Sequence, residues 1–492
     1  MGWRAAALMA VVLAVAGCTL EPAYRRPAAP VPANYPSGEA YAPASGSEPD
    51  RPAAADTGWR DFLGDPRLQG LVELALRNNR DLRVALLNVA QAQALYRIQR
   101  AALFPQLNGS ASGSVTRTPA DESFFGRSIV SNVYTVGVTA SWVLDLFGRL
   151  RSLEHAAFEQ YLASAQARKA AQITLVAQVA DQYLTTLALD EQLAVTGRTL
   201  ETARESYRIV RLQFETGTGS ELDLRQAETV VEQAEANHAA QVRARAQSEN
   251  ALALLVGTAI PDDLPAPATL SEQRLLTDIP AGLPSDLLTR RPDIIEAENV
   301  LRAQHANIGA ARAAFFPRIA LTGELGTSSA RLGGLFKQGS AAWNFSPSLT
   351  TPIFDAGTNL ANLDIAEIQK NVAVAQYEKV IQTAFREVAD GLAARGTYDG
   401  QVDALRRLTI AQQRRLELAD LRYRSGVARY LDVLTAQNDL YIGQLSLVAA
   451  RLQRLTNLVD LYQYLGGGWL ERTGEPPPAA DVPAPQAGGP RL

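Results

Sequence analysis

The second half of this 492-residue chain repeats the first half at a fixed offset of 209 residues. The offset joins Gly148 to Gly357 and Gly257 to Gly466, and no gap is needed between these positions. Two of the matching stretches are Leu212–Gly217 with Leu421–Gly426 and Leu222-Asp223 with Leu431-Asp432. A solenoid repeat has only about 20 to 50 residues. The pattern therefore predicts a duplicated half-molecule, larger than a single compact core.

Composition excludes several classes of protein. The net charge is −4, whereas nucleic-acid-binding domains are normally basic, so we expect no nucleic-acid partner. A single cysteine excludes a disulfide framework and a cysteine-rich metal site. His155, His238 and His305 lie in helical segments without ligand-spaced partners, and we expect ordinary packed or surface side chains there. No phosphate loop or nucleophile elbow is present, so we expect neither catalysis nor a cofactor.

The N-terminus has the pattern of a secretory signal. Arg4 precedes an apolar run, Ala5 to Gly17, that is too short to span a bilayer. Small residues precede Cys18 as in a bacterial lipobox, in which the cysteine is acylated and becomes the first mature residue. An ordinary signal peptide with a chance cysteine is the alternative. We expect Cys18 to be lipidated, since it is the only cysteine of the sequence and stands at the end of the signal. A tri-acylated cysteine holds a protein firmly to a membrane.

Four segments alternate apolar and polar residues with the period of a β-strand. They lie near residues 107–116, 133–144, 319–325 and 343–349, two in each half of the repeat. Each has roughly ten residues, the length that a tilted membrane strand needs. A half-buried sheet of a soluble domain would alternate in the same way, but the lipoprotein signal favours the membrane. Pro347 removes a ladder donor and predicts a bulge or break in the fourth segment.

A sheet in lipid must close, because its edges cannot stay unpaired. Bacterial membrane barrels have an even number of strands, at least about eight, so four strands require several chains. Two copies would give eight strands and a filled interior, and three copies would give twelve strands and a pore. Strand counting alone does not choose between these two assemblies.

A long helix follows each pair of strands. No proline interrupts the chain between Gly148 and Phe214 or between Gly357 and Tyr423. About sixty helical residues span roughly 100 Å, so each helix must pack along neighbours in a coiled coil or a barrel of helices. An earlier helix is expected from residue 65 to about 104, and another is expected to begin near residue 290.

Six short motifs in a fixed order resemble the outer-membrane factors of tripartite efflux pumps, the OprM/TolC family, and within it the NodT-type efflux lipoproteins. The motifs are Pro22–Pro27 after Cys18, Trp59–Pro66, Asp145–Arg149, Arg290–Ile294, Pro352–Gly357 and Leu465–Trp469. Each motif is weak alone, whereas their order and spacing are specific. The resemblance covers nearly the whole chain apart from its tail.

The resemblance implies a mainly α fold with a membrane β-barrel. A homotrimer would contribute four strands per chain to a twelve-stranded outer-membrane barrel, and a long α-helical barrel would project into the periplasm. Six segments follow from this architecture: a signal peptide (1–17), a lipidated tether and equatorial segment (18–64), a first repeat (65–257), an equatorial connector (258–284), a second repeat (285–468) and a partly disordered tail (469–492).

The resemblance also implies a function. The trimer would be a passive exit duct for drugs or small solutes, anchored in outer-membrane lipid. A periplasmic adaptor (membrane fusion) protein would link it to an inner-membrane transporter of the RND type. Two alternatives are an outer-membrane channel for type I protein secretion and a non-conducting coiled-coil structural lipoprotein. The lipobox and the Leu465–Trp469 motif favour efflux of small solutes.

The same resemblance places a periplasmic gate at the tips of the long helices. Leu431 matches a hydrophobic constriction, and Tyr423 matches a tyrosine that latches the closed tip. Thr435 matches the position of an acidic ring but is not acidic, which puts such a ring in doubt. Candidates for a polar latch around Tyr423 are Arg424, Arg429, Asp223 and Asp432. For the two aspartates, complementing the helix dipole is an equal alternative.

Two glycine turns are candidates for adaptor docking, because glycine lets a partner backbone approach closely. They are Thr216-Gly217-Thr218 and Ser425-Gly426-Val427. The two tips share this turn but differ in charge, since Gln213 and Glu215 correspond to Arg422 and Arg424. We therefore expect the tip with Tyr423 and Thr435 to do most of the gating.

Overall fold

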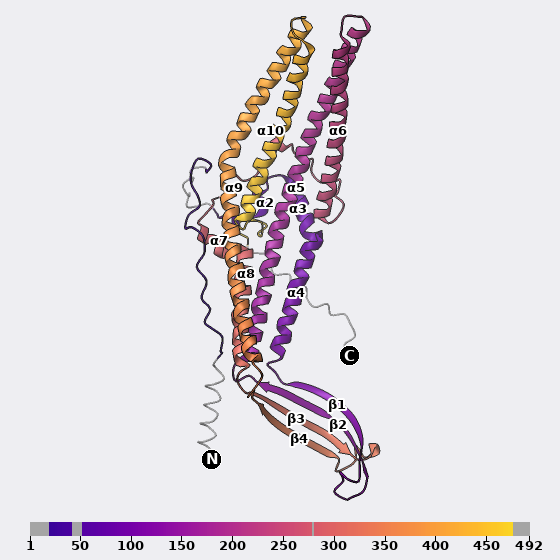
Figure 1. Ribbon diagram of the computed structural model, residues 1–492, viewed down its shortest axis with the longest axis vertical. Coiled ribbons are helices and arrows are strands. Elements are labelled where there is room, and N and C mark those ends of the chain that lie inside the picture. The colour runs from indigo at the N-terminus through magenta and orange to yellow at the C-terminus, as the bar shows by residue number, and fades with distance from the viewer. Residues whose placement is uncertain (1–18, 42–51, 278–279, 476–492) are drawn as a thin grey trace. The chain divides into compact units, whose positions relative to one another are not determined.

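The computed structural model describes residues 19–41, 52–277 and 280–475, drawn in colour in Figure 1. Contacts divide these residues into two compact units. Unit 1 comprises residues 19–28, 88–165 and 296–377, and unit 2 comprises the other described residues. No helix within the described ranges is long and apolar enough to cross a membrane. Residues 1–18, with the predicted signal peptide and Cys18, lie outside these ranges.

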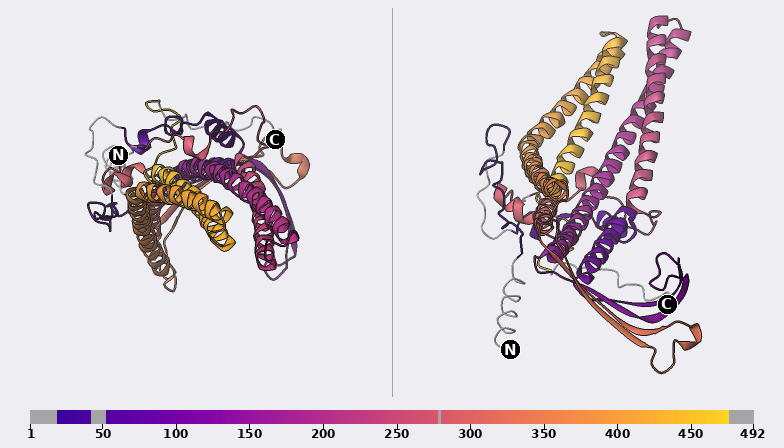
Figure 2. Two further views of the ribbon diagram at one scale, coloured as in Figure 1. Left: turned by 90° about the horizontal axis from the view of Figure 1, so that it is seen from above. Right: turned by 60° about the horizontal axis from the view of Figure 1, so that its bottom comes forward.

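Unit 1 contains a single antiparallel sheet in the order β1-β2-β3-β4. The strands are β1 (Gln106–Thr118), β2 (Ile129–Leu144), β3 (Arg318–Ser329) and β4 (Ala341–Thr350). Figure 2 shows them side by side as one curved sheet. The two predicted strand pairs are thus joined through β2 and β3, and β1 and β4 are the edges. The long helices that follow them run on from unit 1 into unit 2.

The expected break at Pro347 is wrong. Strand β4 continues through this residue, which lies opposite Leu321 of β3. An edge strand is paired on one side only, which is where proline is tolerated in a sheet.

The register of the strands gathers the apolar residues on one face, because directly paired residues point to the same side of a sheet. Leu107 pairs with Ala140, Leu325 pairs with Val138 and with Trp343, and Ile319 pairs with Leu349. Serine, threonine and asparagine dominate the other face. No described residue covers the apolar face, and Trp343 is 78% exposed.

The long helices obey the repeat. Helix α5 (Arg149–Glu215) and helix α9 (Thr358–Arg424) have 67 residues each, and both their first and last residues are related by the 209-residue offset. Their return helices are α6 (Glu221–Val256) and α10 (Tyr430–Tyr464). Gly257, with φ of 76°, ends α6 in the left-handed conformation that a helix C-terminus favours. The expected long helices and their stops are confirmed.

The helix expected from residue 65 to about 104 is broken in two. Helices α3 (Pro66–Asn78) and α4 (Arg80–Ala101) are separated by Asn79, whose backbone is extended. The Asn79 side chain accepts the N–H of Leu82 at 2.9 Å and donates to the carbonyl of Leu255 at 2.9 Å. Asn79 therefore caps α4 and ties the break to the end of α6.

The helix expected from about residue 290 begins earlier, as α7 (Pro284–Arg290), and resumes as α8 (Pro292–Ala313). Arg291 lies between them and is 8% exposed. Its guanidinium contacts Asp293 at 2.6 Å and Glu387 at 2.8 Å. The Arg-Arg-Pro-Asp motif thus joins α8 to α9. Short helical turns are η1 (Ala54–Asp56), α2 (Trp59–Phe62), η2 (Leu270–Glu272) and η3 (Leu332–Gly334).

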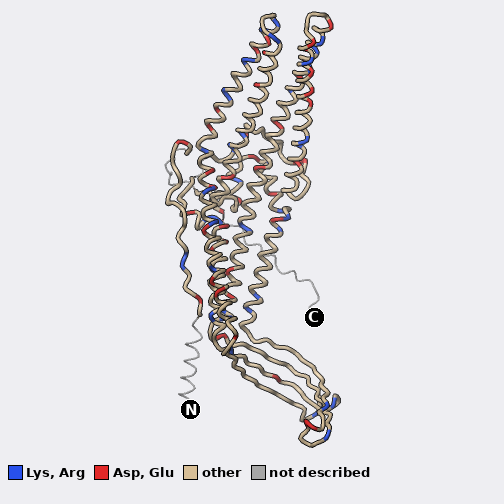
Figure 3. Tube along the Cα trace, viewed as in Figure 1, with Lys and Arg blue, Asp and Glu red and all other residues tan. Residues whose placement is uncertain are grey.

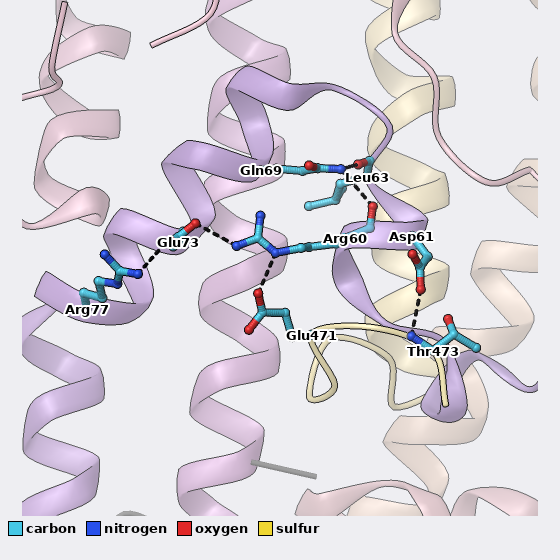
Figure 4. Close-up of polar contacts among 8 residues, drawn as sticks. All are labelled: Arg60, Asp61, Leu63, Gln69, Glu73, Arg77, Glu471 and Thr473. Carbon is cyan, nitrogen blue, oxygen red and sulfur yellow. Dashed lines mark hydrogen bonds and ion pairs between the residues drawn. The ribbon is translucent and has the colours of Figure 1, made fainter. Parts of the chain in front are cut away.

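The segment around α2 and the last described residues are bound together in unit 2 (Figure 4). Arg60 contacts Glu73 at 2.7 Å and Glu471 at 2.6 Å. The N–H of Thr473 donates to Asp61 at 2.7 Å. The first part of the predicted tail is therefore fixed by the Trp59–Pro66 motif, and its remainder, 476–492, lies outside the described ranges.

Candidate functional site

The tips of two helical hairpins in unit 2, α5–α6 and α9–α10, share one small apolar cluster. Its buried members come from three helices: Val210 of α5, Ala227 of α6, and Tyr430 and Val433 of α10. Partly buried side chains packed against them are Tyr207, Leu224, Leu416, Ala419, Tyr423 and Leu434. Residues between this cluster and the turns are largely exposed, so it is the apolar link nearest to the turns.

Tyr423 adds a polar link between the two hairpins. Its hydroxyl donates to Oε1 of Gln213 on α5 at 2.9 Å. Its ring centroid lies 5.2 Å from that of Tyr430. Burial raises the pKa of Tyr423, and the nearby carboxylate of Asp223 adds to this effect. The phenol is therefore a neutral donor at physiological pH.

Sequence reasoning found Tyr423 but missed Gln213 as its partner. The repeat register places Tyr423 opposite Phe214, one position further along. The hydrogen bond therefore joins residues that the repeat does not equate. Only the packing of the two hairpins brings them together.

Leu431 and Thr435 lie one turn apart on α10, and both are exposed. The Leu431 side chain is 45% exposed and lies outside the cluster, whereas Val433 two residues later is buried in it. The Thr435 hydroxyl donates to the Leu431 carbonyl at 2.8 Å. Within one chain, Leu431 and Thr435 therefore present an apolar side chain and a neutral hydroxyl, and the exposed Asp432 follows Leu431 directly.

Two of the charged candidates around Tyr423 have local partners, and the other two lie at the start of a helix. Asp223 belongs to a capping arrangement: its N–H donates to Ser220 at 3.1 Å, and the Ser220 hydroxyl donates back to its carboxylate at 2.7 Å. Arg424 contacts Asp420 on its own helix at 2.9 Å. Arg429 is the N-cap residue of α10, and Asp432 lies in the first turn of that helix. The helix-end roles of Asp223 and Asp432 are thus visible, whereas a latch role stays a prediction.

The two glycine turns have the same backbone geometry. Gly217 has φ of 76° and Gly426 has φ of 74°, and an added Cβ would meet nothing within 4 Å at either position. The N–H of Thr218 donates to the carbonyl of Gln213, and that of Val427 donates to Arg422. Thr216 and Ser425 are exposed beside these glycines, and Val427 is 69% exposed. Both predicted docking turns are therefore accessible.

Residues 19–28 are held against α5 and α8 in unit 1. His155 contacts Glu21 at 3.0 Å, and Arg26 contacts Glu298, which is only 3% exposed, at 2.8 Å. The hydroxyl of Tyr24 also donates to Glu298. Glu159 and Glu21 raise the pKa of His155 to about 10. This histidine is thus a paired surface cation. No group of metal-ligating side chains occurs within the described ranges.

The family model for outer membrane efflux proteins matches residues 71–258 and 283–467. The chain belongs to the outer membrane efflux protein family. It is 49% identical to the probable efflux pump outer membrane protein TtgC of Pseudomonas putida over 472 residues, which is 96% of each chain. It is 46% identical to outer membrane protein OprJ of Pseudomonas aeruginosa, over 94% of this chain and 95% of that one.

Solved structures of this outer membrane efflux protein family have the same fold. The open state of the MtrE outer membrane channel of Neisseria gonorrhoeae aligns with a TM-score of 0.82 at 42% identity. The alignment covers 93% of this chain and all of that one. CusC aligns with a TM-score of 0.80 at 40% identity. The predicted fold class, a mainly helical chain with four strands for a membrane β-barrel, is confirmed.

Membership settles the broad function. The protein is an outer-membrane channel component of an efflux pump, and its helices lie in the periplasm. The family is one of channels and not of enzymes. The relatives give no support to a secretion channel or to a non-conducting structural lipoprotein. The predicted family, location and channel function are confirmed.

Proposed function

We propose that three copies of this chain close one outer-membrane channel, and that the shared tip cluster is its periplasmic gate. The observation that carries this proposal is the sheet of unit 1, with one exposed apolar face and two unpaired edges, β1 and β4. Lipid would cover the apolar face, and pairing β4 of one copy with β1 of the next would leave no free edge. Three copies supply twelve strands, enough to leave a pore.

The helices next to these edge strands support the same pairing between neighbouring copies. Helix α4 leads into β1, and α9 follows β4. In unit 1, α4 exposes Leu95 and Ile98, and α9 exposes Ile365, Ile368 and Val372 at helical spacing. If β4 pairs with β1 of the next copy, these two apolar stripes come together at the same seam. Exposed apolar stripes of this kind mark interaction surfaces.

Gating would depend on the contacts that link the two hairpins at the tip. Near the turns, the small cluster and the bond between Tyr423 and Gln213 link the two hairpins, so few contacts have to break for the tips to separate. Adaptor contacts at the exposed turns around Gly217 and Gly426 would stabilise the separated arrangement, which is a shift of population between two states. Leu431 would narrow the closed pore, and the inner-membrane transporter would supply the energy.

The transported class would be drugs or other small apolar solutes, as in the antibiotic and toluene efflux pumps for which two relatives are named. The pump would include a periplasmic adaptor and an RND-type transporter, and a lipid on Cys18 would anchor the chain.

Cysteine cross-linking tests the trimer. In a Cys18→Ser background, Leu95→Cys combined with Ile365→Cys or Ile368→Cys should form covalent dimers and trimers in membranes on mild oxidation. Leu95→Cys combined with Leu408→Cys is the control and should stay monomeric, because the exposed Leu408 lies 43 residues, roughly 65 Å, further along α9 than Ile365. Oxidised samples that contain no species above the monomer would contradict the assembly. The same Cys18→Ser chain should also lose incorporation of labelled fatty acid.

A further inference from the structure

The four strands contain only three charged residues: Arg117, Arg318 and Glu324. Figure 3 shows how sparse charge is along the strands. Glu324 is the single carboxylate among them and lies in the middle of β3. It is exposed and has no hydrogen-bond or ion-pair partner within the described ranges. A solitary charge in a neutral sheet is expensive unless it faces water.

The strand register decides which side of the sheet carries this carboxylate. Glu324 lies opposite Thr139 of β2 and Asn344 of β4, and Asn108 of β1 is paired with Thr139. All four residues therefore share the polar face. The adjacent residue Leu325 is on the apolar face with Trp343. In a membrane barrel with this pattern, the polar face lines the water-filled interior.

We propose that Glu324 is the residue that determines ion selectivity in the barrel, so that the channel prefers cations and cationic solutes over anions. This inference rests on the proposed trimer, in which three Glu324 carboxylates form one ring around the lumen. Rings of acidic side chains select cations in pores. At the tip, Thr435 supplies a neutral hydroxyl at the position where the resemblance placed an acidic ring, so the barrel ring adds carboxylates that this position does not.

Arg318 is the other charge on this face, and it lies six residues before Glu324 on the same strand. Six strand residues separate the two by roughly 20 Å along β3. The Debye length is about 8 Å at physiological ionic strength. At physiological ionic strength, the ring of Arg318 side chains and the ring of Glu324 side chains in the trimer are therefore screened from each other. Glu324 then acts locally on passing ions. At about 0.01 M salt the Debye length is about 30 Å, and the effect of the ring reaches across the pore.

Reversal potentials in planar bilayers test this assignment. The full-length trimer is measured in a KCl gradient at low ionic strength, and the permeability ratio of K⁺ to Cl⁻ is compared with that of Glu324→Gln, which has nearly the same shape. We expect the ratio to fall by roughly twofold or more in this variant and to fall toward anion preference in Glu324→Lys. Glu324→Asp should retain the cation preference. The difference should shrink as salt is raised.

Two control variants make the result specific. Glu122→Gln removes a carboxylate from the loop between β1 and β2 and should leave the ratio unchanged, whereas Arg318→Gln should raise it at low salt, where the Debye length of about 30 Å exceeds the distance between Arg318 and Glu324. A conducting Glu324→Gln trimer with the wild-type ratio at low salt overturns this inference and leaves the channel intact. A trimer that passes no current in any variant overturns the proposed channel and this inference together.

Discussion

The hydroxyl of Tyr423 donates a 2.9 Å hydrogen bond to Oε1 of Gln213, and this bond joins two hairpins whose sequences are copies of each other. The two residues are not repeat equivalents. The two duplicated halves therefore meet through a contact between non-equivalent positions. This hydrogen bond links the two hairpins at the tip, and it can break while each hairpin stays folded.

Replacing Tyr423 with phenylalanine should favour the open tip. The ring would still pack on Tyr430, but the bond to Gln213 would be lost. A hydrogen bond of this kind contributes about 0.5–1.5 kcal/mol, so the ratio of open to closed tips should rise by roughly two- to tenfold for each subunit. Single-channel recording measures this ratio. Gln213→Ala should act in the same direction, and the double variant should add little, since both remove one bond. Fully additive effects would show that the bond does not hold the tip.

Introducing a carboxylate at Thr435 should create a new cation site at this level of the tip. In Thr435→Asp trimers, three carboxylates would stand next to the Leu431 constriction. Added Mg²⁺ should then reduce conductance more strongly than in wild type, because a hard divalent cation binds carboxylate oxygens. Thr435→Asn is the neutral control of the same shape. Equal sensitivity of all three proteins to Mg²⁺ would show that position 435 does not face the narrow part of the pore.

The link between Glu21 and His155 should depend on pH in a defined window. The pKa of His155 is raised from its ordinary value near 6.5 to about 10, by Glu159 and Glu21. A raised pKa in the folded state means stabilisation that is complete below about 6.5 and is lost as pH rises through about 10. The difference in melting temperature between wild type and His155→Ala should therefore persist at pH 7 to 9 and vanish above about pH 10. A difference that already disappears near pH 7 would contradict the ion pair.

Two glycines of α9 should respond to alanine with opposite signs. At Gly391 an added Cβ would lie 2.6 Å from Cδ2 of Leu461, which is 2% exposed. Overpacking at such a site costs about 1–3 kcal/mol. At Gly400 an added Cβ would meet nothing within 4 Å, so alanine should stabilise the helix by about 0.5–1 kcal/mol. Denaturant midpoints of the two variants should move in opposite directions. A stabilised Gly391→Ala protein would mean that α9 and α10 are less closely packed here.

Much of the fold follows from periodicity alone. The alternation around Leu107 and Trp343 predicted strands with one apolar face, and the absence of proline predicted helices of the length of α5. Both are local signals. The break at Asn79 was not predicted, because the bond that fixes it comes from Leu255, far away along the chain. Gln213 was missed for the same reason, since its role exists only once α5 and α9 are packed. Non-local polar contacts leave no periodic signal in the sequence.

Current through the purified trimer in planar bilayers tests the central claim most directly. The claim is that this chain forms a water-filled channel whose tip, with Leu431 at its narrowest part, limits flow. Leu431→Ala removes most of an exposed apolar side chain without entering the buried cluster around Val433, so the trimer should fold normally and conduct more than wild type. Leu222→Ala, an exposed leucine at the repeat-equivalent position of the other hairpin, should change conductance less. A folded trimer that passes no current, even with Leu431→Ala, would contradict the account.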